Sequence, residues 1–178
     1  MRAKLIKMPL ATSAALLLLL SLAVILAVLG FEHIGGYKPC HLCLIERKAW
    51  YFALPLSALA LLSCRLGRLA PVKWLLLLMV LMFLTNAGLA GYHAGVEWKW
   101  WQGPTSCTGD HLEKLGGGAG GLLEALKQTR VVRCDIARFR LFGLSFSGYN
   151  VLASLFAALI AGMGIIVSQR QMDVPQSD

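Results

Sequence analysis

Four long stretches without a charged side chain constrain this chain more than any other feature. They cover residues 8–31, 49–64, 74–96 and 141–169. A helix needs about 20 mostly apolar residues to cross the hydrocarbon layer of a bilayer, which is about 30 Å thick. Backbone amides in lipid must bond within their own segment, so stretches of this kind fold as helices. The sequence therefore predicts spans at about 8–30, 44–63, 74–92 and 147–167.

The predicted fold class is an all-α membrane protein, a four-transmembrane-helix bundle that forms one integral membrane domain over residues 1–178. Only 15% of the residues are charged, whereas average soluble domains are about 25% charged. The second span reaches the required length only if Glu46, Arg47 and Lys48 lie in its first turns. The first span has the basic flank of a signal peptide. Its apolar run exceeds the usual core of about 7–15 residues, so a retained helix is expected.

The formal net charge of +8 would also suit a protein that binds nucleic acid, but the positions of the basic residues argue against that class. Most of them flank apolar runs or lie in a long loop that also holds five acids. Basic residues at the ends of spans orient a membrane protein. We therefore expect the charge to reflect topology and predict no nucleic-acid partner.

The span count decides which segments share a side of the membrane. One side receives the two loops 31–43 and 93–146, and the other receives segments 1–7, 64–73 and 168–178. The N-terminal tail and the 64–73 turn carry three Lys or Arg each, whereas loop 31–43 carries only Lys38. The long loop carries seven, but the rule that basic loops stay in the cytoplasm weakens with loop length. Both termini are therefore predicted to be cytoplasmic.

This topology puts four of the five cysteines on the outer side of the membrane, where disulfides persist. They are Cys40, Cys43, Cys107 and Cys134. Cys64 lies on the opposite side, and no function is predicted for it. This grouping of the cysteines depends only on the number and order of the spans, because successive loops alternate between the two sides of the membrane.

Cys40 and Cys43 form a C-x-x-C motif where the second helix enters the membrane. The positive end of a helix dipole favours a thiolate there. Arg47 lies four residues after Cys43, one turn along on the same face, where it would stabilise a Cys43 thiolate or an anion on a bound acceptor. Glu46 is a possible ion-pair partner of Arg47. At the lipid boundary, such a thiol can react with a lipid-soluble molecule.

The same motif is also compatible with a zinc site or a static disulfide. A C-x-x-C can be half of a zinc site, but a structural site needs four ligands and the sequence has no second C-x-x-C, so no metal is predicted. A static disulfide is the second alternative, although so small a ring contributes little stabilisation. Arg47 by itself would be an interfacial charge that extends toward water.

Cys107 and Cys134 lie in the long loop, on either side of a glycine-rich run at 116–121. Such a run is flexible and would suit a shuttle, although the pair could also be a fixed staple. Residues 122–127 are predicted to form a short amphipathic helix on the membrane surface. His93 follows the third span at the level of Cys43, where it either lines an acceptor pocket or is an ordinary surface residue.

Together these features resemble disulfide bond formation protein B, the bacterial DsbB family. The resemblance covers nearly the whole chain and is carried by the segments KPCHLC (38–43) followed by Glu46-Arg47, PTSC (104–107), VRCD (132–135), FGLS (142–145) and GYN (148–150). A C-x-x-C alone would be weak support. Two outward cysteine pairs on four spans, with Arg47 at that spacing, are specific.

The resemblance implies a protein-disulfide:quinone oxidoreductase of the bacterial inner membrane, with its redox cysteines on the periplasmic side. Such a protein reoxidises a periplasmic DsbA-like oxidase of thioredoxin fold. The partner's thiolate would attack Cys107, and Cys134 would be the disulfide mate of Cys107 before pairing transiently with Cys40. Cys43 would face the quinone, ubiquinone or menaquinone, with Arg47 and His93 in its pocket. The alternatives are a family paralogue with a dedicated partner, a membrane scaffold with structural disulfides, and an exporter of reductant. The lone Cys64 argues against the exporter.

Overall fold

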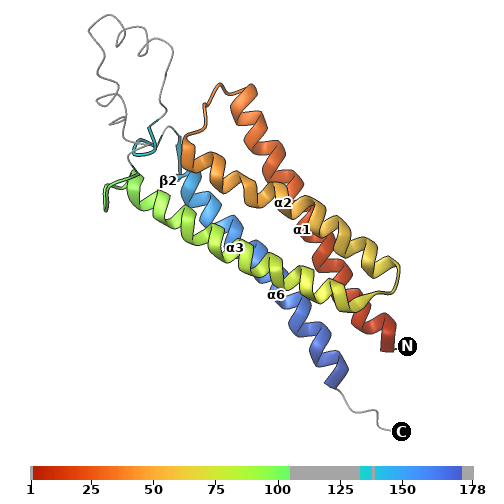
Figure 1. Ribbon diagram of the computed structural model, residues 1–178. Helices are drawn as coiled ribbons and strands as arrows, with labels where there is room; N and C mark the ends of the chain where they lie inside the picture. Colours follow the sequence, from red (N-terminus) through yellow and green to blue (C-terminus); the bar gives the residue numbers. More distant parts are fainter. Residues whose placement is uncertain (1, 105–132, 138, 174–178) are drawn as a thin grey trace, which may run out of the picture.

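The computed structural model describes residues 2–104, 133–137 and 139–173. Long helices dominate this part of the chain and lie side by side in an elongated bundle (Figure 1). Their bounds are α1 Arg2–His33, α2 His41–Arg65, α3 Leu69–Glu97 and α6 Phe146–Asp173. Each overlies one of the predicted spans and extends beyond it at both ends. The structure therefore confirms a helical membrane protein.

The four helices pack as a ring. Helix α1 packs against α2 and α6, and α3 packs against the same two helices, while α1 and α3 have little contact and lie diagonally opposite. Small side chains let the backbones approach closely, as is common between helices in membranes. The fully buried residues accordingly include Ala14, Ala53, Ala60, Ala157 and Ala161. At Gly164 of α6, a Cβ atom would collide with Ser13 of α1.

Three of these helices are long and apolar enough to cross a membrane: Ile6–His33, Leu69–Glu97 and Phe146–Met172. Many of their leucine and phenylalanine side chains are exposed on the outside of the bundle, which is how a helix faces lipid. Helix α2 does not reach the same hydropathy, because Glu46, Arg47 and Lys48 lie in its first turns. A multi-pass membrane protein follows from the three apolar helices.

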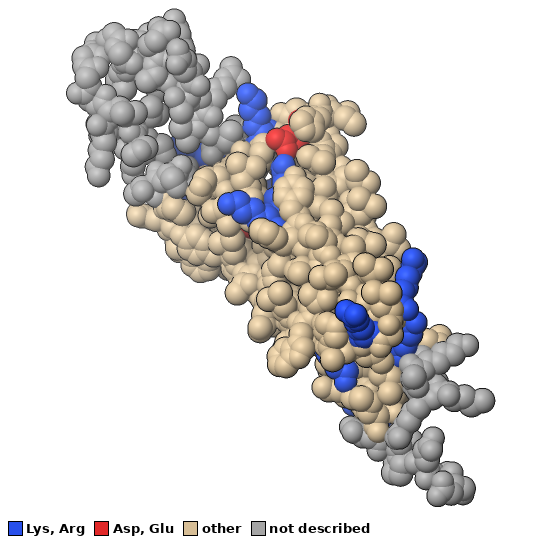
Figure 2. Space-filling view, turned by 45° about the vertical axis from the view of Figure 1, so that its right-hand side comes forward, with Lys and Arg blue, Asp and Glu red and all other residues tan. Residues whose placement is uncertain are grey.

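Charged side chains are distributed along the bundle as expected for such a protein. Lys and Arg gather toward the two ends, and the middle of the visible face is free of charge (Figure 2). The end with both termini and the α2–α3 turn (Figure 1) holds Lys7, Arg65, Arg68, Lys73 and Arg170. This end is the one that the sequence predicts to be cytoplasmic.

The prediction of a purely α-helical chain omitted a small hairpin before α6. Strands β1 (Arg140–Leu141) and β2 (Leu144–Ser145) pair antiparallel. Phe142 and Gly143 join them with φ of 49° and 83°, and two positive values in a two-residue turn suit the right-handed twist of a hairpin. Strands of two residues are too short to show an alternating pattern, so the sequence did not reveal them. The amphipathic helix predicted at 122–127 lies outside the described residues.

Candidate active site

A cavity of about 390 Å³ opens at the end of the bundle opposite the termini. Small-molecule sites commonly measure about 300–1,000 Å³. Its lining comes from α1, α2, α3, α6 and the segment before α6. Five of the six residues singled out from the sequence line it: Cys40, Cys43, Arg47, His93 and Cys134. The sixth, Cys107, lies outside the described residues, so its role and its predicted pairing with Cys134 stay predictions.

Cys40 and Cys43 meet at the first turn of α2. Cys40 is the residue that caps the helix: its sulfur accepts a hydrogen bond from the backbone N–H of Cys43 at 3.2 Å. The two Sγ atoms are 2.6 Å apart, and both cysteines are free. The pKa of the Cys40 thiol is lowered by its hydrogen-bond contacts with the side chains of Cys43 and His93, although burial raises it. Cys40 is therefore suited to be a thiolate, and the pair is close enough to form a disulfide.

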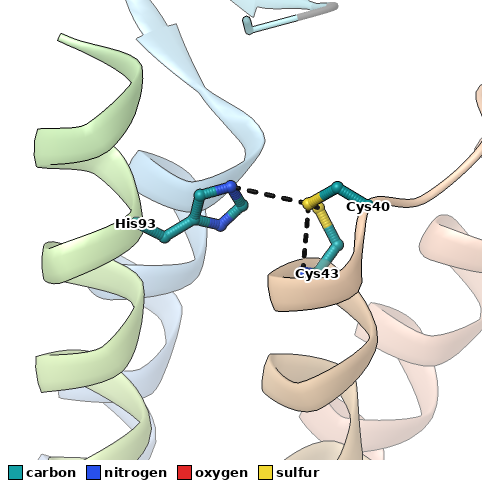
Figure 3. A group of neighbouring side chains, drawn as sticks. All are labelled: Cys40, Cys43 and His93. Atoms are coloured by element: carbon teal, nitrogen blue, oxygen red, sulfur yellow. Dashed lines mark hydrogen bonds between the residues drawn. The ribbon is translucent and has the colours of Figure 1, made fainter. Parts of the chain in front are cut away.

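His93 on α3 faces Cys40 at the start of the neighbouring helix α2 (Figure 3). Its Nε2 atom is 3.6 Å from Cys40 Sγ, and its Nδ1 donates to Glu46 Oε1 at 2.7 Å. The His93 and Glu46 side chains are only 2% and 6% exposed. A proton held on Nδ1 by the carboxylate leaves Nε2 free to accept the thiol proton, which is the arrangement of an activated nucleophile. The structure therefore favours the pocket position for His93 over the surface position.

Glu46 is anchored in turn by α6. Asn150 Nδ2 donates to Glu46 Oε2 at 2.8 Å, and Trp50 Nε1 donates to Asn150 Oδ1 at 2.8 Å. The possibility that Glu46 pairs with Arg47 is thus replaced by the contact with His93. Sequence reasoning also missed Asn150, because it lies more than 100 residues from Glu46 and only the packing of α6 brings it there.

Glu97 is a second buried carboxylate beside His93. Its Oε1 is 3.9 Å from His93 Nε2, and its side chain is 7% exposed. The hydroxyl groups of Ser145 and Ser147 donate to its other oxygen. The spacing of four residues from His93 on one helix was the available sequence clue to this contact. Two carboxylates thus flank one imidazole beside the cavity.

Arg47 is oriented by α1. Its Nη1 donates to Glu32 Oε2 at 2.6 Å, and the two side chains are 10% and 27% exposed. Its Nε atom is buried and has no hydrogen-bond partner among the described residues. Because an unpaired buried donor is costly, this atom is available to a ligand in the cavity.

Aromatic rings form one wall of the cavity. The rings of Phe139 and Phe146 stack at 4.8 Å, and Phe31 and Tyr37 meet both of them edge-on or tilted. All four residues line the cavity. A wall of this kind suits a flat apolar ligand.

Cys134 lies beside the Cys40–Cys43 pair. It is disulfide-bonded and 1% exposed, and it packs in one apolar cluster with Cys40 and Leu42. Asp135 beside it accepts hydrogen bonds from Lys99 and Arg133. The first cysteine pair and one member of the second therefore lie at the same end of the bundle, as the span count requires.

The same residues also resemble part of a metal site. The ligand atoms of Cys40, Cys43 and His93 lie within 4.8 Å of one another (Figure 3). Zinc accepts sulfur and imidazole ligands, but a structural site is usually closed by four of them. Among the described residues the group has three members. Its proximity to a disulfide-bonded cysteine favours redox chemistry.

Comparison with known proteins agrees with this arrangement. A family model described as disulfide bond formation protein DsbB matches residues 11–164. An uncharacterised protein, RP370 of Rickettsia prowazekii (strain Madrid E), is 24% identical over 132 residues, which are 74% of each chain. No solved structure matches the chain significantly. Because the family model covers most of the sequence, this chain belongs to the DsbB family, whose members are thiol oxidoreductases of disulfide bond formation.

Proposed function

We propose that this chain reoxidises a periplasmic DsbA-like thiol oxidase and passes the two electrons through two cysteine pairs to a membrane quinone. Family membership supports the thiol chemistry. The observation that carries the proposal is the cavity in which the free thiols of Cys40 and Cys43 lie beside disulfide-bonded Cys134. A dithiol, a disulfide and a cavity at one end of a membrane bundle are the parts that such a relay needs.

The proposal includes a four-span topology with both termini in the cytoplasm of a bacterial cell and the cavity at the periplasmic face. Helix α2 has 25 residues, which at about 1.5 Å per residue is long enough to cross a bilayer. It also packs between the apolar helices α1 and α3. Glu46 and Arg47 in its first turns would then lie near the membrane boundary and point into the protein, where charges in membrane proteins are tolerated.

The exchange steps balance in electrons and atoms. A partner thiolate attacks Cys107, a mixed disulfide forms, and Cys134 leaves as a thiolate. The second partner thiol then releases Cys107, so the partner ends as a disulfide. Cys134 attacks Cys40 of an oxidised Cys40–Cys43 pair, and Cys43 leaves as a thiolate with the electron pair. Cys107 then attacks Cys134, which restores that disulfide and leaves the Cys40–Cys43 pair reduced.

Oxidising the Cys40–Cys43 dithiol again requires an acceptor stronger than the partner. A DsbA-type protein has a potential of about −120 mV, and about 30 mV corresponds to 1.4 kcal/mol for two electrons. When bound, a quinone accepts two electrons and two protons. The residues present fit such a group, because the cavity has an aromatic wall and the unpaired Nε of Arg47. Arg47, His93 and Cys43 would hold it.

His93 has a separate task in this scheme. With its Nδ1 proton held by Glu46, its Nε2 can accept the proton of the Cys40 thiol. Cys40 is the leaving group of the last exchange and becomes the attacking group when its disulfide with Cys43 reforms, and an attacking group must be a thiolate. Cys40, His93 and Glu46 are all buried, so this proton transfer takes place inside the protein.

The test is anaerobic mixing of the purified protein, a reduced DsbA-like partner and a quinone. We expect the quinone absorbance to fall as the partner's thiols disappear, with one quinone consumed per partner disulfide formed. A scaffold with structural disulfides predicts no change in free thiols when quinone is added. Absence of quinone reduction with a competent partner would rule the proposal out.

Arg47→Gln is expected to weaken the apparent affinity for quinone by about tenfold, because a hydrogen bond from a charged donor contributes about 1.5–3 kcal/mol. The apparent KM for quinone should rise more than kcat falls. Lys48→Gln is the matched control, since Lys48 is exposed on the next position of α2. Identical kinetics of Arg47→Gln and the parent across quinone concentrations would contradict this role.

A further inference from the structure

The segment that carries Cys134 is tied to the end of α3 by one buried carboxylate. Asp135 is 9% exposed. Its Oδ2 atom accepts from Lys99 Nζ at 2.5 Å and from Arg133 Nη2 at 2.7 Å, and its Oδ1 accepts from Arg133 Nε at 2.9 Å. Exposed ion pairs contribute little, but a bidentate Arg–carboxylate contact within a network of charges is the exception. The bidentate contact with Arg133 lies within the segment and orients the carboxylate, and the contact with Lys99 joins the segment to the end of α3.

Lys99 is itself fixed to α3. It adopts a left-handed conformation with φ of 64°, and its backbone N–H donates to the carbonyl of Val96 at 3.1 Å. The same helix carries His93, whose Nε2 lies 3.6 Å from Cys40 Sγ. Helix α3 therefore contacts Cys40 through His93, and the turn directly after the helix contacts Asp135, next to Cys134, through Lys99.

We propose that Asp135 is a positioning residue that keeps Cys134 within reach of Cys40, so that the two cysteine pairs can exchange electrons. The inference rests on the proposed function and names a residue on which electron transfer between the two cysteine pairs depends. Cys134 packs with Cys40 in one apolar cluster. Because thiol–disulfide exchange depends on access of the attacking sulfur, holding that contact raises the effective concentration of one cysteine at the other.

The experiment measures this effective concentration without partner or quinone. In a Cys43→Ser, Cys64→Ser, Cys107→Ser background, only Cys40 and Cys134 remain, and their disulfide is equilibrated with a glutathione redox buffer. Alkylation and mass spectrometry give the oxidised fraction. Adding Asp135→Asn should lower the effective concentration by about tenfold, which corresponds to about 1.4 kcal/mol.

Matched variants separate the contact between Asp135 and Lys99 from a general loosening of the protein. Asp135→Glu should retain most of the parent value, and Lys99→Met should lower it, whereas Lys48→Met, an exposed lysine on α2, should not. In a second background with Cys40 and Cys43 as the only cysteines, Asp135→Asn should leave the equilibrium unchanged. An equal loss for both pairs would indicate general loosening and overturn the inference, as would no loss for Cys40–Cys134.

The pH dependence provides a further check. Lys99 and Arg133 hold the pKa of Asp135 well below its usual range. Because this carboxylate pKa is depressed, the contacts of Asp135 with Lys99 and Arg133 are fully present above the ordinary Asp pKa of about 3.9. They are lost only as the pH falls toward the lower pKa of the folded protein. The ratio of effective concentrations between parent and Asp135→Asn should thus stay constant from about pH 8 to about pH 5. A ratio that falls toward one across this range would contradict the proposed positioning role of the Asp135 carboxylate.

Discussion

Replacing Cys43 with serine is expected to lower quinone reduction by roughly a thousandfold or more, the scale on which removal of an essential nucleophile acts. The variant keeps Cys107 and Cys134, so a reduced partner should still form a mixed disulfide. It lacks the sulfur that would deliver the electron pair from the C-x-x-C motif. Anaerobic mixing monitored by quinone absorbance measures the loss, and a non-reducing gel measures partner capture.

Two further cysteine variants make this result specific. Cys107→Ser should trap no partner, because it removes the sulfur that the partner is proposed to attack. Cys64→Ser should behave like the parent, since Cys64 is buried near the opposite end of the bundle. Normal quinone reduction by Cys43→Ser would show that electrons leave by another route.

Replacing His93 with glutamine is expected to slow thiol–disulfide exchange at Cys40 by roughly a hundredfold, the lower end of the range for general acid–base catalysis. Glutamine keeps a polar side chain in the buried position but cannot take the thiol proton. Glu46→Gln should have a smaller effect in the same direction, because it weakens the contact that fixes the imidazole tautomer. The rate is measured with glutathione disulfide in quinone-free protein whose only cysteines are Cys40 and Cys43.

Omitting quinone separates proton transfer from ligand binding. If His93 only lined the acceptor pocket, His93→Gln would change the KM for quinone and leave exchange with glutathione disulfide at the parent rate. His33→Gln is the control, since His33 is exposed at the end of α1. Equal exchange rates for parent and His93→Gln would therefore remove the base role.

The site was only partly predictable from the sequence, for reasons that differ from residue to residue. Cys40, Cys43 and Arg47 are local: a C-x-x-C at a helix start and an arginine one turn later can be identified from spacing. For Cys134, the sequence predicted only that it lies on the same side of the membrane as Cys40. Their shared apolar cluster depends on how the segment before α6 packs.

The buried polar network lay beyond sequence reasoning. Glu46 lies next to Arg47 in the chain, but successive residues on a helix point in different directions. Glu46 therefore turns to His93 on α3 and Asn150 on α6, while Arg47 turns to Glu32 on α1. A neighbour in sequence was thus the wrong partner, and only the packing of helices identified the right ones.

That this chain is a helical membrane protein follows from its sequence alone, because the cost of unbonded backbone amides in lipid leaves a long uncharged stretch no other fold. The sequence also establishes which cysteines share a side if all four helices span, since that depends only on counting. Which side chains meet across the bundle is set by the packing of the helices. Such contacts depend on the rotation of each helix about its axis, and the apolar surface of a lipid-facing helix leaves that rotation undefined in the sequence.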